Sequence, residues 1–166
     1  MVQIVATGVC HSDISVHQAV LPSPLPVVLG HESAGTVIAV GPNVNNLIVG
    51  DRVVLSLLAQ CGTCFYCSHN QPVLCETGQA SMLRGTMADG TTRYRWKGQP
   101  VFQMTGLGTF SERVVVPAGC AIRIPDSLPI EEAALLGCGV ITGVGAAINT
   151  AKITIGESVA VIGCGG

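Results

Sequence analysis

The chain has 166 residues, of which 48% are apolar and only 11% are charged. This composition is typical of one folded domain, or of one domain and part of another, and excludes an intrinsically disordered chain. The net charge of −2 offers no electrostatic basis for binding nucleic acid or an anionic membrane, so we expect neither partner. The sequence shows no bilayer-spanning apolar run and no signal peptide, and we therefore expect a cytoplasmic protein.

The first half of the chain is predicted to form mainly β structure. Residues 37–40 and 52–55 are short runs rich in β-branched residues, and glycine-containing turns flank them. Residues 110–116 predict another strand. Short strands with frequent Gly and Pro indicate a barrel-like β domain. The polar, glycine-rich residues 78–105 are expected to form a long surface loop.

The pattern becomes helical after Pro125. Ser127 is predicted to cap a helix that runs to Leu136, because acidic residues follow in the first turn. A glycine on each side of Cys138 should interrupt this helix, and residues 141–151 then resume the helical pattern.

The end of the chain predicts a buried strand followed by a glycine turn. Residues 158–162 are all apolar except for the first, and Gly163, Gly165 and Gly166 come after them. A complete dinucleotide-binding fingerprint needs a further spaced glycine, a helix and an acidic residue about twenty positions on. The chain contains only the start of this pattern, and we interpret it as a fragment.

Four of the eight cysteines lie close together, with the spacing C-x2-C-x2-C-x7-C: Cys61, Cys64, Cys67 and Cys75. Thiolates on one loop suit the tetrahedral coordination of zinc. Two alternatives stay open. The first is free thiols or disulfides, although cysteines so close in sequence reach disulfide geometry with difficulty. The second is a four-iron cluster. A zinc ion with four protein ligands would stabilise this lobe and leave no position for a substrate.

Cys10, His31 and Cys138 form a second candidate ligand set. Two sulfurs and one nitrogen would leave one tetrahedral position open, which is the requirement for a catalytic zinc. Each residue also has an ordinary interpretation, since a lone histidine beside glycine is commonly a hydrogen-bonding residue and a lone cysteine a small core residue. Sequence separation alone does not pair Cys10 with Cys138.

Several segments resemble the zinc-dependent medium-chain alcohol dehydrogenase family. They are GVCHSD at 8–13, GHESAG at 30–35, GDRV at 50–53 and GCGVITG at 137–143, and they occur in the family's order around the four-cysteine loop. Within the family, the chain most resembles the branch of class III and S-(hydroxymethyl)thiol dehydrogenases and related bacterial alcohol dehydrogenases.

The resemblance implies a mixed β and α/β fold. Residues 1–125 would form a GroES-like β-barrel catalytic domain, with a structural zinc lobe at about 58–78. Residues 126–166 would supply linking helices and the first strand of a Rossmann domain. The family has further β structure before the position of Met1, so the resemblance implies truncation at both ends.

The resemblance also implies two zinc ions per chain. Cys10, His31 and Cys138 match the ligands of the family's catalytic zinc, whose Cys2His set is well known. The four-cysteine loop matches its structural zinc site. Glu32 matches a carboxylate beside the catalytic metal, and Asp13 matches the carboxylate that orients the ligand His31.

Proton transfer and coenzyme binding are assigned on the same basis. Ser12 and His17 match a proton relay, since a hydroxyl can accept and donate at once and an imidazole can pass a proton outward. His11 matches a pyrophosphate contact of the family, and Thr142 matches a residue that lines its nicotinamide site. The opening glycine turn, with Gly163, Gly165 and Gly166, would also contact the coenzyme.

Four further residues are placed with less detail. Leu57 and Phe110 fall at substrate-pocket positions of the family. Cys120 and Cys164 match no ligand and are predicted to be core thiols.

The implied activity is reversible hydride transfer between a small alcohol or aldehyde and NAD, with zinc as Lewis acid. The parent protein would be a homodimer or homotetramer, and the fragment is expected to be inactive alone. One alternative is S-(hydroxymethyl)glutathione or mycothiol (formaldehyde) dehydrogenase, which differs only in substrate. An alternative of another class is a non-catalytic zinc-binding module. The sequence leaves open which alcohol is used and whether the coenzyme is NAD or NADP.

Overall fold

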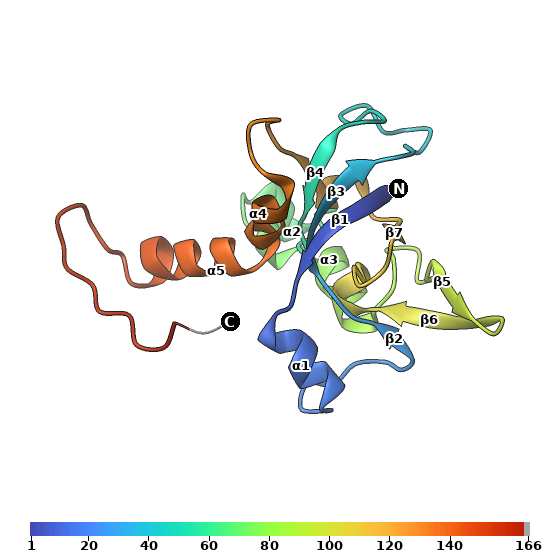
Figure 1. Cartoon of the computed structure of the whole chain (residues 1–166), viewed down its shortest axis with the longest axis horizontal. Helices are drawn as coiled ribbons and strands as arrows, with labels where there is room; N and C mark the ends of the chain where they lie inside the picture. The colour runs from blue at the N-terminus through green and yellow to red at the C-terminus, as the bar shows by residue number, and fades with distance from the viewer. Residues whose placement is uncertain (165–166) are drawn as a thin grey trace.

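Five short antiparallel strands form the main sheet of the computed structural model, which describes residues 1–164. In sheet order they are β7 (Arg113–Val114), β1 (Val2–Gly8), β3 (Glu32–Val37), β4 (Arg52–Leu55) and β8 (Ala121–Arg123), as Figure 1 shows in part. The β1 and β3 strands approach closely at Gly35. A Cβ added there would lie 2.1 Å from the Gln3 carbonyl oxygen. A side chain at this position would separate the two strands.

A second, three-stranded sheet corrects the prediction of a long loop over 78–105. β2 (Val27–Val28) pairs in parallel with β6 (Gln99–Gln103), and β6 pairs antiparallel with β5 (Tyr94–Trp96). Lys97 and Gly98 join β5 to β6 with φ angles of 51° and 79°, as tight hairpin turns require. The hairpin is exposed at its tip, and its polar composition concealed the strands.

The predicted barrel is not closed within residues 1–164, because the edge strands β7 and β8 do not pair with each other. Two predicted strands also differ in extent. The strand expected over 37–40 lies earlier, since β3 ends at Val37. The strand expected over 110–116 is reduced to β7, because Phe110 instead donates its backbone N–H to the Leu29 carbonyl in a loop. The expected strand over 52–55 is confirmed as β4.

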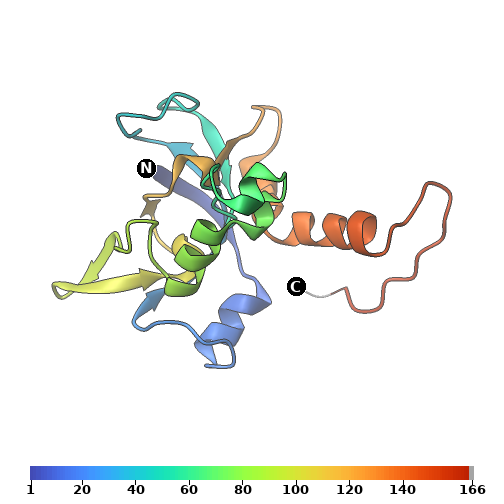
Figure 2. The same cartoon turned by 180° about the vertical axis from the view of Figure 1, so that it is seen from behind.

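The helices lie beside the sheets or extend away from them, as Figures 1 and 2 show. The α-helices are α1 (His11–His17), α2 (Phe65–Ser68), α3 (Glu76–Arg84), α4 (Ile130–Ala134) and α5 (Gly139–Gly145). Single 3-10 turns occupy Pro72–Leu74, Met104–Gly106, Ala118–Cys120 and Leu135–Gly137, and α5 continues as a π-helical segment over Ala146–Thr150.

The helical region after Pro125 partly follows its prediction. α4 begins at Ile130 after Pro129, so the prediction that Ser127 caps it is wrong. The proline already has a φ of −56°, which suits the residue that leads into a helix. The predicted interruption is confirmed at Cys138, whose φ and ψ of −142° and −72° are not helical.

Small residues let α4 pack directly on the main sheet. Ala133 and Ala134 are buried against Ala34 of β3 and Val54 of β4. A larger cluster fills the other face of the sheet around Val53 and Leu55. The core therefore fixes the start of the segment that carries Cys138.

The C-terminal segment does not form the predicted strand over 158–162. These residues have no strand partner, and Ile162 is 98% exposed. An apolar run becomes a strand only beside a neighbour that pairs with its backbone. The start of a Rossmann domain is thus not confirmed. In Figure 1 α5 and this segment extend away from the sheets.

No single described helix is long and apolar enough to cross a membrane, although the bent pair Ile130–Gly137 and Gly139–Thr150 reaches that length and composition.

Candidate metal centres

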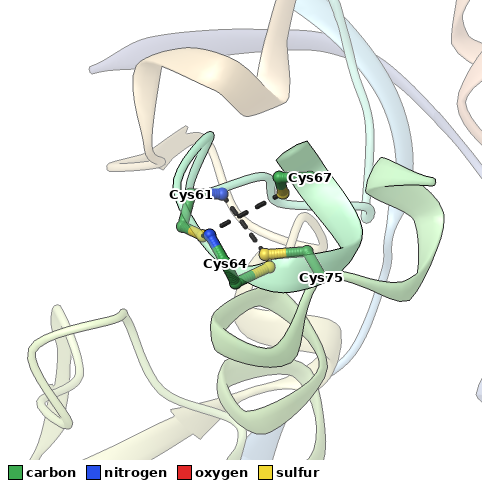
Figure 3. A group of neighbouring side chains, drawn as sticks. All are labelled: Cys61, Cys64, Cys67 and Cys75. Atoms are coloured by element: carbon green, nitrogen blue, oxygen red, sulfur yellow. Dashed lines mark hydrogen bonds between the residues drawn. The ribbon is translucent and has the colours of Figure 1, made fainter. Parts of the chain in front are cut away.

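The four cysteines of the loop converge on one point. Cys61 precedes α2, Cys64 is its N-cap residue, Cys67 lies within it, and Cys75 lies at the start of α3. Their four Sγ atoms lie within 4.8 Å of one another. Figure 3 shows the four cysteines grouped around one point. The short helix and the following 3-10 turn bend the chain back on itself. Local structure alone therefore assembles the group.

The sulfur separations fit a shared metal ion better than disulfides. The Sγ atoms of Cys61 and Cys67 are 4.0 Å apart. Two thiolates bound tetrahedrally to zinc at about 2.3 Å lie about 3.8 Å apart, whereas a disulfide needs about 2.05 Å. All eight cysteines of the chain are free thiols.

Backbone amides of the loop favour the ionised form of some of these sulfurs. Thr63 and Cys64 donate backbone N–H groups to Cys61 Sγ at 3.5 and 3.3 Å. These bonds lower the pKa of Cys61 to about 5. Desolvation instead raises the pKa of Cys67 to about 11. A cation among the sulfurs would supply the charge that ionises every thiol of the group.

The second ligand set is assembled by tertiary structure. Cys10 is the N-cap residue of α1, His31 precedes β3, and Cys138 lies at the break between α4 and α5. One ligand atom from each lies within 4.8 Å of the others, and the two Sγ atoms are 4.0 Å apart. Desolvation and, second to it, the charge of the neighbouring Cys10 raise the pKa of Cys138 to about 11. Three ligand atoms from distant segments thus meet in one partly buried group.

Asp13 holds the backbone beside two members of this set. Its carboxylate is buried and accepts backbone N–H bonds from Cys10 at 3.0 Å and from Gly30 at 2.8 Å. The distance from its Oδ1 to His31 Nδ1 is 3.6 Å, which is longer than a hydrogen bond. Nδ1 of His31 is buried and has no hydrogen-bond partner among the described residues. In this structure Asp13 therefore positions the set through the backbone.

Glu32 links the third member to the sheet. Its buried carboxylate accepts the backbone N–H of Gly139 at 3.1 Å. A Cβ at Gly8 or Gly139 would lie only 3.0 or 3.1 Å from the Glu32 side chain. The two glycines therefore make room for a carboxylate directly beside Cys138.

The residues expected to transfer the proton lie on one helix without touching. Ser12 Oγ is 3.6 Å from Cys10 Sγ, so its hydroxyl lies beside the ligand set. His17 is exposed at the other end of α1. Residues five apart are rotated roughly 140° around a helix. A proton passing from Ser12 to His17 would need a bridging hydroxyl or water.

The residues expected to contact the coenzyme lie on exposed surface. His11 begins α1, and Thr142 lies on α5. Gly163 is exposed in the C-terminal segment, while Gly165 and Gly166 lie outside the described residues. His11 follows Cys10, and Thr142 lies one helical turn after Cys138, whose Sγ is 4.0 Å from that of Cys10.

The remaining assignments have mixed outcomes. Leu57 is partly buried against the main core, and Phe110 packs against Gly30, where a Cβ would lie 2.6 Å from its ring. Cys120 is confirmed as a buried thiol, but Cys164 is exposed, so its assignment as a core thiol is wrong. It lies in the exposed C-terminal segment, directly after Gly163.

One residue near the second set was not predicted. Thr109 is completely buried and donates its backbone N–H to the Gly30 carbonyl at 3.0 Å. It thereby fixes the turn that leads into His31. Its position after a glycine within an apolar stretch was the only available signal.

Comparison with known proteins connects this geometry to a family. Residues 1–126 match the model of the alcohol dehydrogenase GroES-like domain. The chain is 44% identical, over its whole length, to S-(hydroxymethyl)glutathione dehydrogenase of Synechocystis sp., of which it spans 45%. It is also similar to the crystal structure of an alcohol dehydrogenase zinc-binding domain protein from Burkholderia ambifaria, with 41% identity, a TM-score of 0.86 and coverage of 95% of this chain and 43% of that one. Benzyl alcohol dehydrogenase from Acinetobacter calcoaceticus gives 37% identity, a TM-score of 0.81 and coverage of 92% and 41%. The chain therefore belongs to the alcohol dehydrogenase family with a GroES-like domain, and it spans less than half the length of these relatives.

Proposed function

We propose that this chain is the zinc-binding part of an oxidoreductase that interconverts alcohols and aldehydes by hydride transfer to and from NAD. The observation that carries the proposal is the group formed by Cys10, His31 and Cys138, whose ligand atoms lie within 4.8 Å of one another. A tetrahedral ion held by three protein ligands keeps one position for a substrate. The four-cysteine group, by contrast, would hold a closed structural zinc.

The residues present fit a zinc ion at the open site. The donor set is two thiols and one imidazole, and the 4.0 Å separation of the Cys10 and Cys138 sulfurs is close to that of two thiolates on one zinc. When bound, zinc supplies Lewis acidity toward the oxygen of an alcohol or carbonyl compound. Asp13 accepts the backbone N–H groups of Cys10 and Gly30, and Glu32 accepts that of Gly139, so the two carboxylates hold the ligand segments in place.

Ser12 is the residue that we propose accepts the substrate's hydroxyl proton. Its hydroxyl lies beside the ligand set and can donate onward while it accepts. His17, at the exposed end of α1, would deliver that proton to solvent through a bridging hydroxyl or water. This path would take the proton from the open metal site to bulk water.

The coenzyme is proposed on the family resemblance. His11 and Thr142 would be this chain's contacts to NAD, and Gly163, Gly165 and Gly166 would open the phosphate-binding turn. Three further expectations also stay predictions. They are the division of the chain between residues 125 and 126, the homodimeric or homotetrameric state of the parent protein, and its cytoplasmic location.

Two substrate classes have support from the comparisons. The 44% identity over the whole chain favours an S-(hydroxymethyl)thiol such as the glutathione or mycothiol adduct of formaldehyde. Similarity to benzyl alcohol dehydrogenase favours a simple alcohol. Activity of the full-length protein with formaldehyde plus glutathione, compared with benzyl alcohol, would separate the two.

Metal analysis tests the proposal against a non-catalytic zinc-binding module. We expect two zinc ions per reconstituted chain and one in Cys138→Ser. Cys164→Ser, which changes an exposed thiol outside both groups, is the matched control and should keep two. With cobalt in place of zinc, an added small ligand such as pyrazole should change the visible spectrum of the wild type but not of Cys138→Ser. One metal per chain, or two sites that both ignore pyrazole, would support the module instead.

A further inference from the structure

Two threonines from distant segments bond to the backbone on both sides of His31. Thr109 donates its backbone N–H to the Gly30 carbonyl at 3.0 Å. Thr7, near the end of β1, donates its hydroxyl to the Glu32 carbonyl, also at 3.0 Å. The Oγ1 atoms of the two threonines are 3.3 Å apart. The carbonyl groups before and after His31 therefore belong to one hydrogen-bond network.

The hydrogens of the two hydroxyls can satisfy this network together. Each threonine hydroxyl has one hydrogen to donate and can also accept. When Thr7 donates to Glu32, its oxygen can accept the hydrogen of Thr109. Thr109 is completely buried, and Thr7 is the only hydrogen-bond partner of its hydroxyl within residues 1–164. An unpaired buried hydroxyl costs free energy, so burial favours this bond.

The turn before His31 leaves little room for another arrangement. Gly30 has a φ of 96°, which residues with a Cβ rarely adopt. A Cβ there would lie 2.7 Å from Thr109 Oγ1. Asp13 accepts the Gly30 N–H at 2.8 Å, while Thr109 donates to the Gly30 carbonyl. Gly30 is thus held at both of its polar backbone groups.

The backbone matters here because the His31 side chain has no hydrogen bond at its buried Nδ1. This atom has no partner among the described residues and lies 3.6 Å from Asp13 Oδ1. A metal-bound histidine is usually oriented by a hydrogen bond to its second ring nitrogen. Without that bond, the direction of the imidazole depends on the backbone to which it is attached.

We propose that Thr7 and Thr109 are positioning residues of the open metal site. Their paired hydroxyls fix the backbone around His31 and thereby the direction from which its imidazole meets a metal ion. The inference rests on the proposed function, because it requires that Cys10, His31 and Cys138 bind that ion. Neither threonine belongs to the ligand group, so their removal should weaken metal binding at this site without abolishing it.

Cobalt binding to the chain measures this effect. The pyrazole-sensitive part of the cobalt spectrum reports the open site, and competition with a chelator gives its affinity. Thr109→Val removes the hydroxyl at nearly constant shape and should weaken cobalt binding there about ten-fold. Thr109→Ser keeps a hydroxyl and should bind as the wild type does. Thr7→Val together with Thr109→Val should cost less than the sum of the two single losses, because both variants remove the same bond.

Two controls separate positioning from a general loss of stability. Thr150→Val, at an exposed threonine, should leave the open site unchanged. The four-cysteine group should keep its cobalt in every variant, whereas partial unfolding would weaken both sites together.

The positioning roles are refuted if Thr109→Val binds cobalt at the open site as tightly as the wild type, if Thr109→Ser is as weak as Thr109→Val, or if both sites weaken in parallel. A wild-type chain without any pyrazole-sensitive cobalt band would instead refute the proposed function, and this inference with it.

Discussion

Asp13→Asn tests how the second ligand set is held. The Asp13 carboxylate is 2% exposed and accepts one backbone N–H from Cys10 and one from Gly30. Cys10 carries one ligand sulfur, and Gly30 directly precedes the ligand His31. An asparagine can keep only one of the two bonds, because its amide nitrogen would face the other N–H donor.

The expected loss follows from this bond count. A hydrogen bond to a charged group contributes about 1.5–3 kcal/mol, and an unpaired buried donor costs about 1–3 kcal/mol. These terms overlap, so we expect Asp13→Asn to lower the free energy of unfolding by about 2–4 kcal/mol. Asp13→Ala loses both bonds and should be at least as unstable. Because the ligands themselves are held less firmly, metal affinity at this site should fall by roughly 10–100-fold.

Urea unfolding of the zinc-loaded chain would measure the first quantity, and competition with a chromogenic chelator the second. Asp126→Asn is the control, since the Asp126 side chain is 98% exposed and lies 4.0 Å from Arg52. It should match the wild type in both assays. If Asp13→Asn changes the unfolding free energy by less than about 0.5 kcal/mol, as ordinary surface substitutions do, the carboxylate does not clamp the two segments.

Three further predictions concern other parts of the structure. Cys64→Ser should lower the thermal unfolding temperature more than Cys138→Ser, because a closed structural site contributes directly to folding; the reverse order would refute the two roles. Cys120 has a pKa raised by burial from 9.0 to about 11, so its stabilising contribution is complete below pH 9 and is lost as pH rises toward 11. This loss of unfolding free energy is about 3 kcal/mol at most. Cys120→Ala should therefore flatten the fall in stability between these pH values. If urea titrations show the same dependence of unfolding free energy on pH in the variant, the assignment is contradicted. Gly137→Ala would place a Cβ 2.5 Å from the Leu55 carbonyl oxygen, whereas a Cβ at Gly143 meets nothing within 4 Å. We expect Gly137→Ala to cost about 1–3 kcal/mol by overpacking and Gly143→Ala to be tolerated, as calorimetry of the two variants would show.

Local features were the most accurately predicted from sequence. The four-cysteine group could be identified from spacing, because its ligands lie within one short segment that helix α2 and a 3-10 turn fold back on itself. The helix break at Cys138 was predicted for the same kind of reason, since adjacent glycines disfavour helix. Polar composition misled in one place, where residues 94–103 form a hairpin with an exposed tip.

Long-range features needed the folded chain. Cys10 and Cys138 are 128 positions apart, and only the family resemblance paired them, because no local pattern records which segments a sheet brings together. The apolar residues 158–162 were expected to form a strand, yet strand formation depends on a pairing neighbour that lies elsewhere in space.

The sequence by itself determined which residues can bind metal, because ligand chemistry is a property of side-chain type and close spacing. Tertiary structure alone decided that Asp13 acts on Cys10 and Gly30 through their backbone, and that Glu32 reaches Gly139. It also decided that the buried Thr86 hydroxyl has no hydrogen-bond partner among residues 1–164. Hydrogen bonds of this kind depend on distances between α1, β3 and the start of α5, which lie far apart in the sequence and come together only in the folded chain.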